Sequence, residues 1–99
     1  MVEKDYVYCT AIIKSTNKVD YDQLIDIFKE LEKNTSEEEG CISFQVIPML
    51  KEKGTIALWE VWKDKEAFYK HHSFSHTIRI AEQKLTEVIV FESSVKLEI

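Results

Sequence analysis

The chain has 99 residues, which is enough for one hydrophobic core, so we expect a single domain spanning residues 1–99. Hydrophobic residues make up 44% of it, and only two glycines and one proline occur, which excludes a disordered or low-complexity chain. The formal net charge of -5, without a basic stripe, argues against binding to nucleic acid or to an anionic membrane surface.

The sequence also predicts a cytoplasmic protein. Its first residues show no basic segment followed by an apolar one, so we expect no secretory signal, and no apolar run is long enough to cross a bilayer. Cys9 and Cys41 lie in apolar, strand-like segments without C-x-x-C spacing. We interpret both cysteines as reduced and buried, as is usual in the cytoplasm.

The first half of the chain predicts a strand followed by a helix. Residues 6–13 are β-branched and aromatic with almost no polar interruption, which is typical of a strand buried on both faces. Asp20 occupies an N-cap position and Gln23 the capping-box position that goes with it. From about Tyr21 into residues 36–39, apolar side chains recur at helical spacing at Leu24, Ile27, Phe28 and Leu31.

The second half predicts a hairpin, two helical segments and a last strand. Residues 41–50 and 55–62 read as strands joined by a short link that contains a glycine. Pro48 cannot donate a hydrogen bond to a sheet, so the first of these strands should lie at a sheet edge. Helical segments at 64–71 and about 74–85 follow, with a break near Ser73, and the final strand lies within residues 88–97.

The order strand, helix, strand, strand, helix, strand predicts an α+β, ferredoxin-like βαββαβ fold with an antiparallel sheet. Its usual strand order, 4-1-3-2, puts the second strand at an edge. The helices can cover only one face of this sheet, yet the central strands are apolar on both. A second copy of the chain is the simplest cover, so we expect a homodimer. The partner should contact either Val7, Cys9, Ala11 and Ile13 or the residues that alternate with them.

Two groups of motifs lie between residues 39 and 76. Residues 39–44, Glu-Gly-Cys-Ile-Ser-Phe, resemble the pattern E-x-G-C-x-x-[YF] at the entry into a strand. Residues 60–76 resemble the pattern E-x-W-x-[DS]-x-x-A-[LF]-x-x-H-x-x-[ST]-x-H, with His71 and His76 at the two histidine positions. Both patterns are those of the antibiotic biosynthesis monooxygenase (ABM) family of small dimeric α+β barrels. The chain departs from them at Phe74, where a small residue is commoner, and at Thr77, where an aromatic is usual.

The resemblance implies a cofactor-independent monooxygenase that oxidises an electron-rich phenol or quinol with dioxygen. Such a reaction needs no metal, flavin or haem, because the substrate itself supplies the electrons. The resemblance assigns acid–base roles to His71 and His76, with Glu60 orienting a ring nitrogen or the substrate hydroxyl. It assigns the walls of the substrate cavity to the aromatic residues Trp62, Phe44 and Phe68.

Three of these residues also have a purely structural interpretation. His71 lies three residues after Phe68, beside the core-facing stripe, where it can be a satisfied interior polar group. Glu60 shares a strand face with Trp62 and can form a salt bridge at the sheet end, because a buried carboxylate needs a partner. Trp62 itself can be a core residue. We expect His72 at a solvent-exposed or rim position.

The sequence leaves two further functions open and argues against a metal. His72 and His76 have i, i+4 spacing, but no H-E-x-x-H motif or cysteine pair completes a site, so we expect no metal and no other cofactor. The same fold and histidines suit an acid–base isomerase of a small signalling metabolite. A dimeric ligand-binding or stress-response module without chemistry is the third interpretation.

Overall fold

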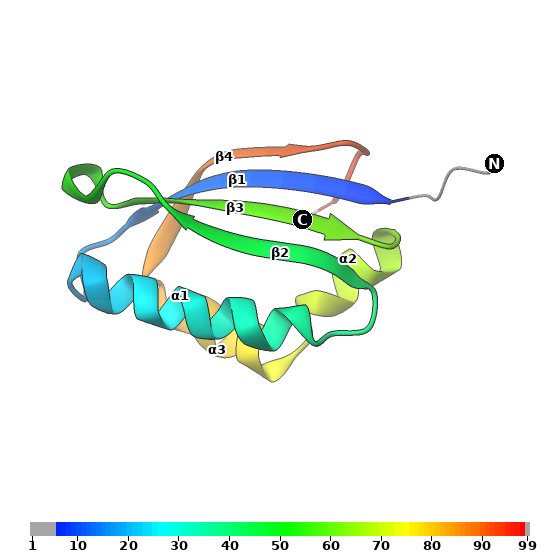
Figure 1. The fold of residues 1–99 in the computed structure, drawn as a ribbon, viewed down its shortest axis with the longest axis horizontal. Helices are drawn as coiled ribbons and strands as arrows, with labels where there is room; N and C mark the ends of the chain where they lie inside the picture. The colour runs from blue at the N-terminus through cyan, green and yellow to red at the C-terminus, as the bar shows by residue number, and fades with distance from the viewer. Residues whose placement is uncertain (1–5, 99) are drawn as a thin grey trace.

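The structure, a computed structural model, describes residues 6–98. It contains one antiparallel sheet of four strands in the order β2-β3-β1-β4. The strands are β1 (Val7–Ser15), β2 (Cys41–Pro48), β3 (Thr55–Trp62) and β4 (Thr86–Ser93). The helices α1 (Tyr21–Ser36), α2 (Lys65–His71) and α3 (Ser75–Gln83) all lie on one face of the sheet (Figure 1). The predicted ferredoxin-like α+β fold and its strand order are confirmed.

The helix α1 begins where its capping residue predicts. The carboxylate of Asp20 accepts a hydrogen bond from the backbone N–H of Gln23 at 2.8 Å, which satisfies one of the free amides of the first turn. The predicted apolar stripe packs on the sheet, with Leu24, Phe28 and Leu31 buried. Among residues 6–98, none of the helices is long and apolar enough to cross a membrane.

The edge strand β2 is held by α1. Glu32 accepts a hydrogen bond from the N–H of Val46 at 2.7 Å, and Lys29 donates one to the carbonyl of Val46 at 2.9 Å. These two contacts occupy backbone groups that would otherwise be open to pairing with another strand. Pro48, at the end of β2, pairs with Ile56 on β3 and lies at the edge as predicted.

The strand β1 has one covered and one open face, which corrects the prediction of burial on both faces within one chain. Val7, Cys9, Ala11 and Ile13 are buried under the helices. Tyr8 between them is 54% exposed on the other face. Of the two alternatives for the dimer interface, the set that includes Ala11 is therefore the helix-facing core, and the alternating set is open.

The two cysteines are free and lie on strands that do not pair with each other. Cys9 is buried, whereas Cys41 is half-buried and so departs from the prediction. Burial, with a smaller contribution from Glu60, raises the pKa of the Cys9 thiol to about 12. Burial also raises the pKa of Cys41 to about 11. Both thiols therefore stay protonated at neutral pH and are poor nucleophiles.

The last strand begins two residues before the predicted segment and ends earlier. A shift in pairing between Ile12 and Ile13 introduces an irregularity in β4, where the partner changes from Val90 to Val88. Val88, Ile89 and Val90 are all exposed. The continuous apolar run in this strand therefore marks an uncovered part of the sheet, in the same way as Tyr8 on β1.

Candidate active site

The strand β3 places Glu60 and Trp62 on the helix-covered face of the sheet. Their partners on β1 are Cys9 and Val7, which belong to the buried set, and Glu60 also pairs with Phe44 on β2. The indole Nε1–H of Trp62 donates a hydrogen bond to Oε1 of Glu60 at 2.9 Å. Trp62 is fully buried, so this bond gives its indole N–H the partner that burial demands.

The environment of Glu60 favours the protonated carboxyl group. Burial raises the pKa of Glu60 above its ordinary value, and the nearby carboxylate of Glu38 adds to this effect. The hydrogen bond from the Trp62 indole opposes both, because it stabilises the charged form. The predicted salt bridge to Glu60 is replaced by this hydrogen bond.

The helix α2 carries His71 into the core through a close contact with the turn before β2. Asp64 caps the helix by accepting a hydrogen bond from the N–H of Ala67 at 2.8 Å. Gly40 has φ +94°, and a Cβ there would lie only 2.7 Å from the Cβ of Ala67. A glycine is therefore needed for both the backbone conformation and the packing. His71, in the last turn of α2, is only 5% exposed.

Two aromatic rings and one carboxylate surround His71. Its ring centroid lies 4.9 Å from that of Trp62 and 5.6 Å from that of Phe44. Its Nδ1 lies 2.9 Å from Oε2 of Glu38, in the turn after α1. A carboxylate can only accept a hydrogen bond, so Nδ1 of the neutral ring carries the proton and Nε2 carries the lone pair.

The same carboxylate oxygen also binds the second predicted histidine. Nε2 of His76, in the first turn of α3, lies 2.6 Å from Oε2 of Glu38. The ring of Phe74 stacks on His76 at a centroid distance of 5.6 Å and an interplanar angle of 8°. Oγ1 of Thr77 lies 3.3 Å from Nδ1 of His71. The two positions at which the chain departs from the family pattern thus contact the two histidines.

Burial decides the protonation of His71. Desolvation of the ring lowers its pKa below the ordinary value, and the hydrogen bond and charge of Glu38 oppose this without reversing it. His71 is therefore a neutral imidazole at neutral pH, with a defined tautomer. This is the state that a proton acceptor requires.

The structure brings together most of the predicted site residues in one chain of contacts. Glu60 bonds to Trp62, Trp62 packs on His71, and His71 is joined to His76 through Glu38. The carboxylate that contacts the ring nitrogens is thus Glu38 and not Glu60, whose other predicted role, orienting the substrate hydroxyl, stays a prediction.

Two other predicted positions lie beside this chain of contacts. Phe68 is buried next to it, and its ring contacts those of His72 and Phe91, at centroid distances of 4.8 and 6.4 Å. His72 is exposed, as predicted, and its Nδ1 lies 2.9 Å from the carbonyl oxygen of Phe68.

Glu38 is the residue that sequence reasoning missed, although the pattern contained the signal. In E-x-G-C the glutamate stands two residues before the glycine. With the glycine at Gly40, that glutamate is Glu38 and not the adjacent Glu39. Glu38 is buried, whereas Glu39 is exposed. A shift of the pattern by one residue thus replaces Glu38, at the centre of the site, with Glu39, a surface charge.

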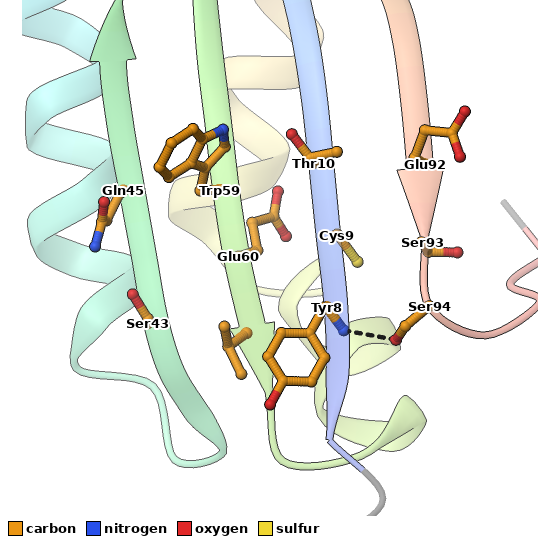
Figure 2. A pocket seen from close by; sticks show the side chains of 11 residues that line it. Tyr8, Cys9, Thr10, Ser43, Gln45, Trp59, Glu60, Glu92, Ser93 and Ser94 are labelled. Carbon is orange, nitrogen blue, oxygen red and sulfur yellow. Dashed lines mark hydrogen bonds between the residues drawn. The ribbon is translucent and has the colours of Figure 1, made fainter.

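Two of the hollows of the molecule border residues of this cluster. The rings of Trp62, Phe44 and Phe68 are buried and fill the space between helices and sheet, where a cavity was predicted. A groove of about 410 Å³ runs between α1 and α3 and is lined by His76. A pocket of about 420 Å³ lies on the open face of the sheet, and Figure 2 shows Trp59 and Tyr8 over it with Glu60 alongside.

A family model described as antibiotic biosynthesis monooxygenase matches residues 15–83. The chain belongs to this family. It is 41% identical over 81 residues to YjcS, an uncharacterized protein of Bacillus subtilis strain 168, and the match covers 82% of this chain and 77% of that protein. A solved structure of protein YJCS is similar with a TM-score of 0.87 at 37% identity, over 93% of this chain and 99% of that one.

More distant structures share the fold. A candidate antibiotic biosynthesis monooxygenase from Deinococcus radiodurans has a TM-score of 0.73 at 17% identity, over 94% of each chain. At this identity the likeness concerns the fold alone. Membership of the ABM family supports a general ABM-type oxidoreductase function, within which the reaction and substrate have to be argued from the site.

Proposed function

We propose that the protein is a cofactor-independent monooxygenase that oxidises an electron-rich phenol or quinol with dioxygen. The observation that carries this proposal is the buried His71, which is neutral, fixed in one tautomer by Glu38 and packed against the rings of Trp62 and Phe44. Such a group can remove a phenolic proton inside an apolar aromatic environment, where the resulting anion is a better electron donor to dioxygen.

The electron balance of such a reaction needs no added reductant. For a hydroquinone, one oxygen atom of O₂ enters the ring and the other leaves as water. The product is a hydroxyquinone, so the substrate supplies all four electrons that O₂ accepts. The protein has to bind the ring, take up a proton and exclude bulk water. Nε2 of His71 takes the proton in this scheme, and Glu38 stabilises the imidazolium that forms.

The substrate ring has to displace a side chain to reach His71. Trp62 and Phe44 now occupy the space beside the imidazole. We propose that the ring of Phe44 or Trp62 changes rotamer when the substrate enters, because rotamer changes are the commonest adjustment of a preformed site on binding. Trp62 would break its bond to Glu60 in the second case, which would free a carboxyl group of raised pKa to bind a substrate oxygen.

We also propose that the protein acts as a homodimer joined through the open face of the sheet. Tyr8 on β1 and Trp59 on β3 are 54% and 55% exposed there, and Val90 on β4 is also exposed. Exposed aromatic residues gathered on one uncovered sheet face are typical of a self-association surface. A second copy seated on this face would also close the pocket beside Trp59 shown in Figure 2.

The experiment that tests the activity is oxygen uptake by the purified protein with a panel of hydroquinones, with product analysis by mass spectrometry. The proposal predicts stoichiometric O₂ consumption and a product that gains one oxygen atom from ¹⁸O₂. Exchange of solvent deuterium into a carbonyl compound without O₂ uptake would favour the isomerase instead. Binding of such compounds without any turnover would favour the non-catalytic module.

Sedimentation equilibrium at micromolar concentration tests the dimer. The chain has a mass of 11.6 kDa, so a dimer has twice this value. Trp59→Lys should shift the distribution toward the monomer without unfolding the chain, because Trp59 is exposed within one subunit. A wild-type mass near that of one chain at this concentration would contradict the dimer.

A further inference from the structure

Glu38, His71 and His76 bring three potential metal-ligand atoms to one point. One ring nitrogen of His71, one of His76 and a carboxylate oxygen of Glu38 all lie within 4.8 Å of one another. Two of the separations are already 2.9 and 2.6 Å, because both nitrogens bind the same oxygen. Around a tetrahedral ion with bonds of about 2.0–2.2 Å, ligand atoms stand roughly 3.3–3.6 Å apart. The cluster thus needs shifts of under about 1 Å in those two separations, smaller than a rotamer change.

The second oxygen of the same carboxylate points to a missing partner. Oε1 of Glu38 is buried and makes no hydrogen bond among the described residues. Buried carboxylate oxygens are normally satisfied, and one that is not indicates an ion or water that belongs at the site. An ion held by Glu38 through both oxygens would satisfy Oε1 and leave Oε2 in place between the histidines.

The surroundings give a cation a route to this cluster. The side chains of Glu38 and His71 are 4% and 6% exposed, but that of His76 is 19% exposed. His76 lines the groove between α1 and α3, to which Asp26 and Glu30 contribute carboxylates and Arg79 a single positive charge. The groove therefore carries a net negative charge that attracts cations to His76.

We propose that Glu38, His71 and His76 form a reversible binding site for a divalent transition-metal ion of the zinc type. Two imidazoles and one carboxylate are a ligand set that zinc and other first-row ions use. The sequence predicts no metal because no further ligand motif accompanies the i, i+4 pair of His72 and His76. The structure instead combines His76 with His71 and Glu38, three residues from separate segments of the chain.

Metal binding would change which nitrogen of His71 carries a proton. A neutral imidazole has one proton, which the Glu38 contact holds on Nδ1. An ion on Nδ1 leaves only Nε2 for that proton, so Nε2 changes from an acceptor into a donor. The ion would thus remove the proposed base without blocking the site. This inhibition rests on the proposed function, whereas the binding site itself does not. The ion would act as an inhibitor and not as a cofactor of the reaction.

Binding is measured on chelator-treated protein, by calorimetric titration with Zn²⁺ and by the visible absorption of added Co²⁺. We expect saturation at one ion per chain. Loss of a second-shell partner costs about 10- to 100-fold in metal affinity, so loss of a ligand in His76→Ala or Glu38→Gln should cost more than about 100-fold. The matched control is His72→Ala, because His72 is adjacent to His71 but exposed and outside the cluster.

The result that overturns the proposal is non-saturable binding, or a loss of affinity in His72→Ala as large as that in His76→Ala. The His76 side chain is 19% exposed and lies in the groove, so its variant stays informative even if Glu38→Gln does not fold. Imidazole ¹⁵N–¹H spectra should show His71 changing from the Nδ1–H to the Nε2–H tautomer as Zn²⁺ is added, and an unchanged tautomer would contradict the assigned ligand atoms. Zn²⁺ should also suppress quinol oxidation in proportion to occupancy. If the protein oxidises no quinol, the binding and tautomer measurements still decide the site.

Discussion

The two faces of the sheet are built from alternate residues of the same strands, yet they carry opposite kinds of chemistry. On the covered face, Trp62 and His71 are buried under the helices, where the Trp62 indole bonds to Glu60 and the His71 imidazole to Glu38. On the open face, Tyr8 and Trp59 expose about half of their surface and border a shallow pocket. Burial on the covered face therefore shifts the pKa values of Glu60 and His71, whereas the open face offers apolar surface to which another molecule can bind.

The difference shows that the hydrophobic pattern of a central strand does not tell which face is covered. Residues 6–13 are apolar on both sides, and in one chain only the set with Ala11 is buried. The site lies on the face where burial is complete, because only there are charges desolvated enough to alter their acid–base behaviour.

The largest difference between the two faces is expected when the same charge is introduced at two neighbouring residues of β1, one on each face. Ala11→Asp places a carboxylate under the helices, where desolvation costs several kcal/mol, and we expect the chain to unfold or to lose most of its stability. Thr10→Asp, one residue away on the open and exposed side, should leave a folded chain but weaken the dimer. Chemical denaturation measures the first effect and sedimentation the second. Equal stability losses in the two variants would remove the distinction between the faces.

A second prediction concerns the link between Glu38 and His71 on the covered face. In metal-free protein, Glu38→Gln removes the carboxylate that raises the pKa of His71, so burial should lower that pKa further. The acidic limb of the kcat/KM profile should move to lower pH, and kcat should fall roughly 10- to 100-fold because the tautomer is no longer fixed. A purely structural role for Glu38 would lower stability but leave the position of the limb unchanged. Glu39→Gln, at the exposed neighbouring position, is the control.

A smaller effect is expected on the way the free energy of unfolding depends on pH, to which Glu60 contributes. Its pKa is raised in the folded chain, so above its ordinary value of 4.5 the folded state binds more protons than the unfolded state. The contribution of Glu60 to stability is therefore lost as pH rises through this range. Glu60→Gln should remove that loss, and its free energy of unfolding relative to wild type should increase between pH 4.5 and pH 7. A constant difference across this range would show that Glu60 is not perturbed.

The smallest expected change is a spectroscopic one. In a Trp59→Phe background, Trp62 is the remaining tryptophan, buried and bonded to Glu60. Binding of a quinol beside His71 should change its emission if Trp62 moves. Trp62→Phe in the otherwise unchanged chain reports the signal of Trp59 alone and is the control. Unchanged Trp62 emission at saturating quinol would indicate that Phe44 moves, or that the quinol binds on the open face.

Local patterns predicted the fold well because its elements have clear local signals. Asp20 and Asp64 cap their helices through their own side chains, and Pro48 identifies the edge strand. These signals need only a few adjacent residues. The strand order then follows from general rules of chain connection.

The site was less predictable because its central residue lies in a turn. Glu38 is one of four acidic or serine residues in sequence at 36–39, and nothing in their composition separates it from its neighbours. Its burial arises from tertiary contacts with His71 and His76, more than thirty residues later in the chain. The spacing of the family pattern identified both histidines, and the same pattern, with Gly40 as its glycine, marks Glu38, but it does not show that this carboxylate lies between them.

The most direct test of the central claim compares quinol oxidation by His71→Ala and His72→Ala under the same conditions. The two variants remove adjacent imidazoles, one buried against Trp62 and bonded to Glu38, the other exposed. Removal of a catalytic base lowers turnover by at least about 100-fold, so we predict this loss of kcat in His71→Ala and a near wild-type value in His72→Ala, with both variants folded. Full turnover by a folded His71→Ala, on a quinol that the wild type oxidises, would contradict the assignment of His71 as the base.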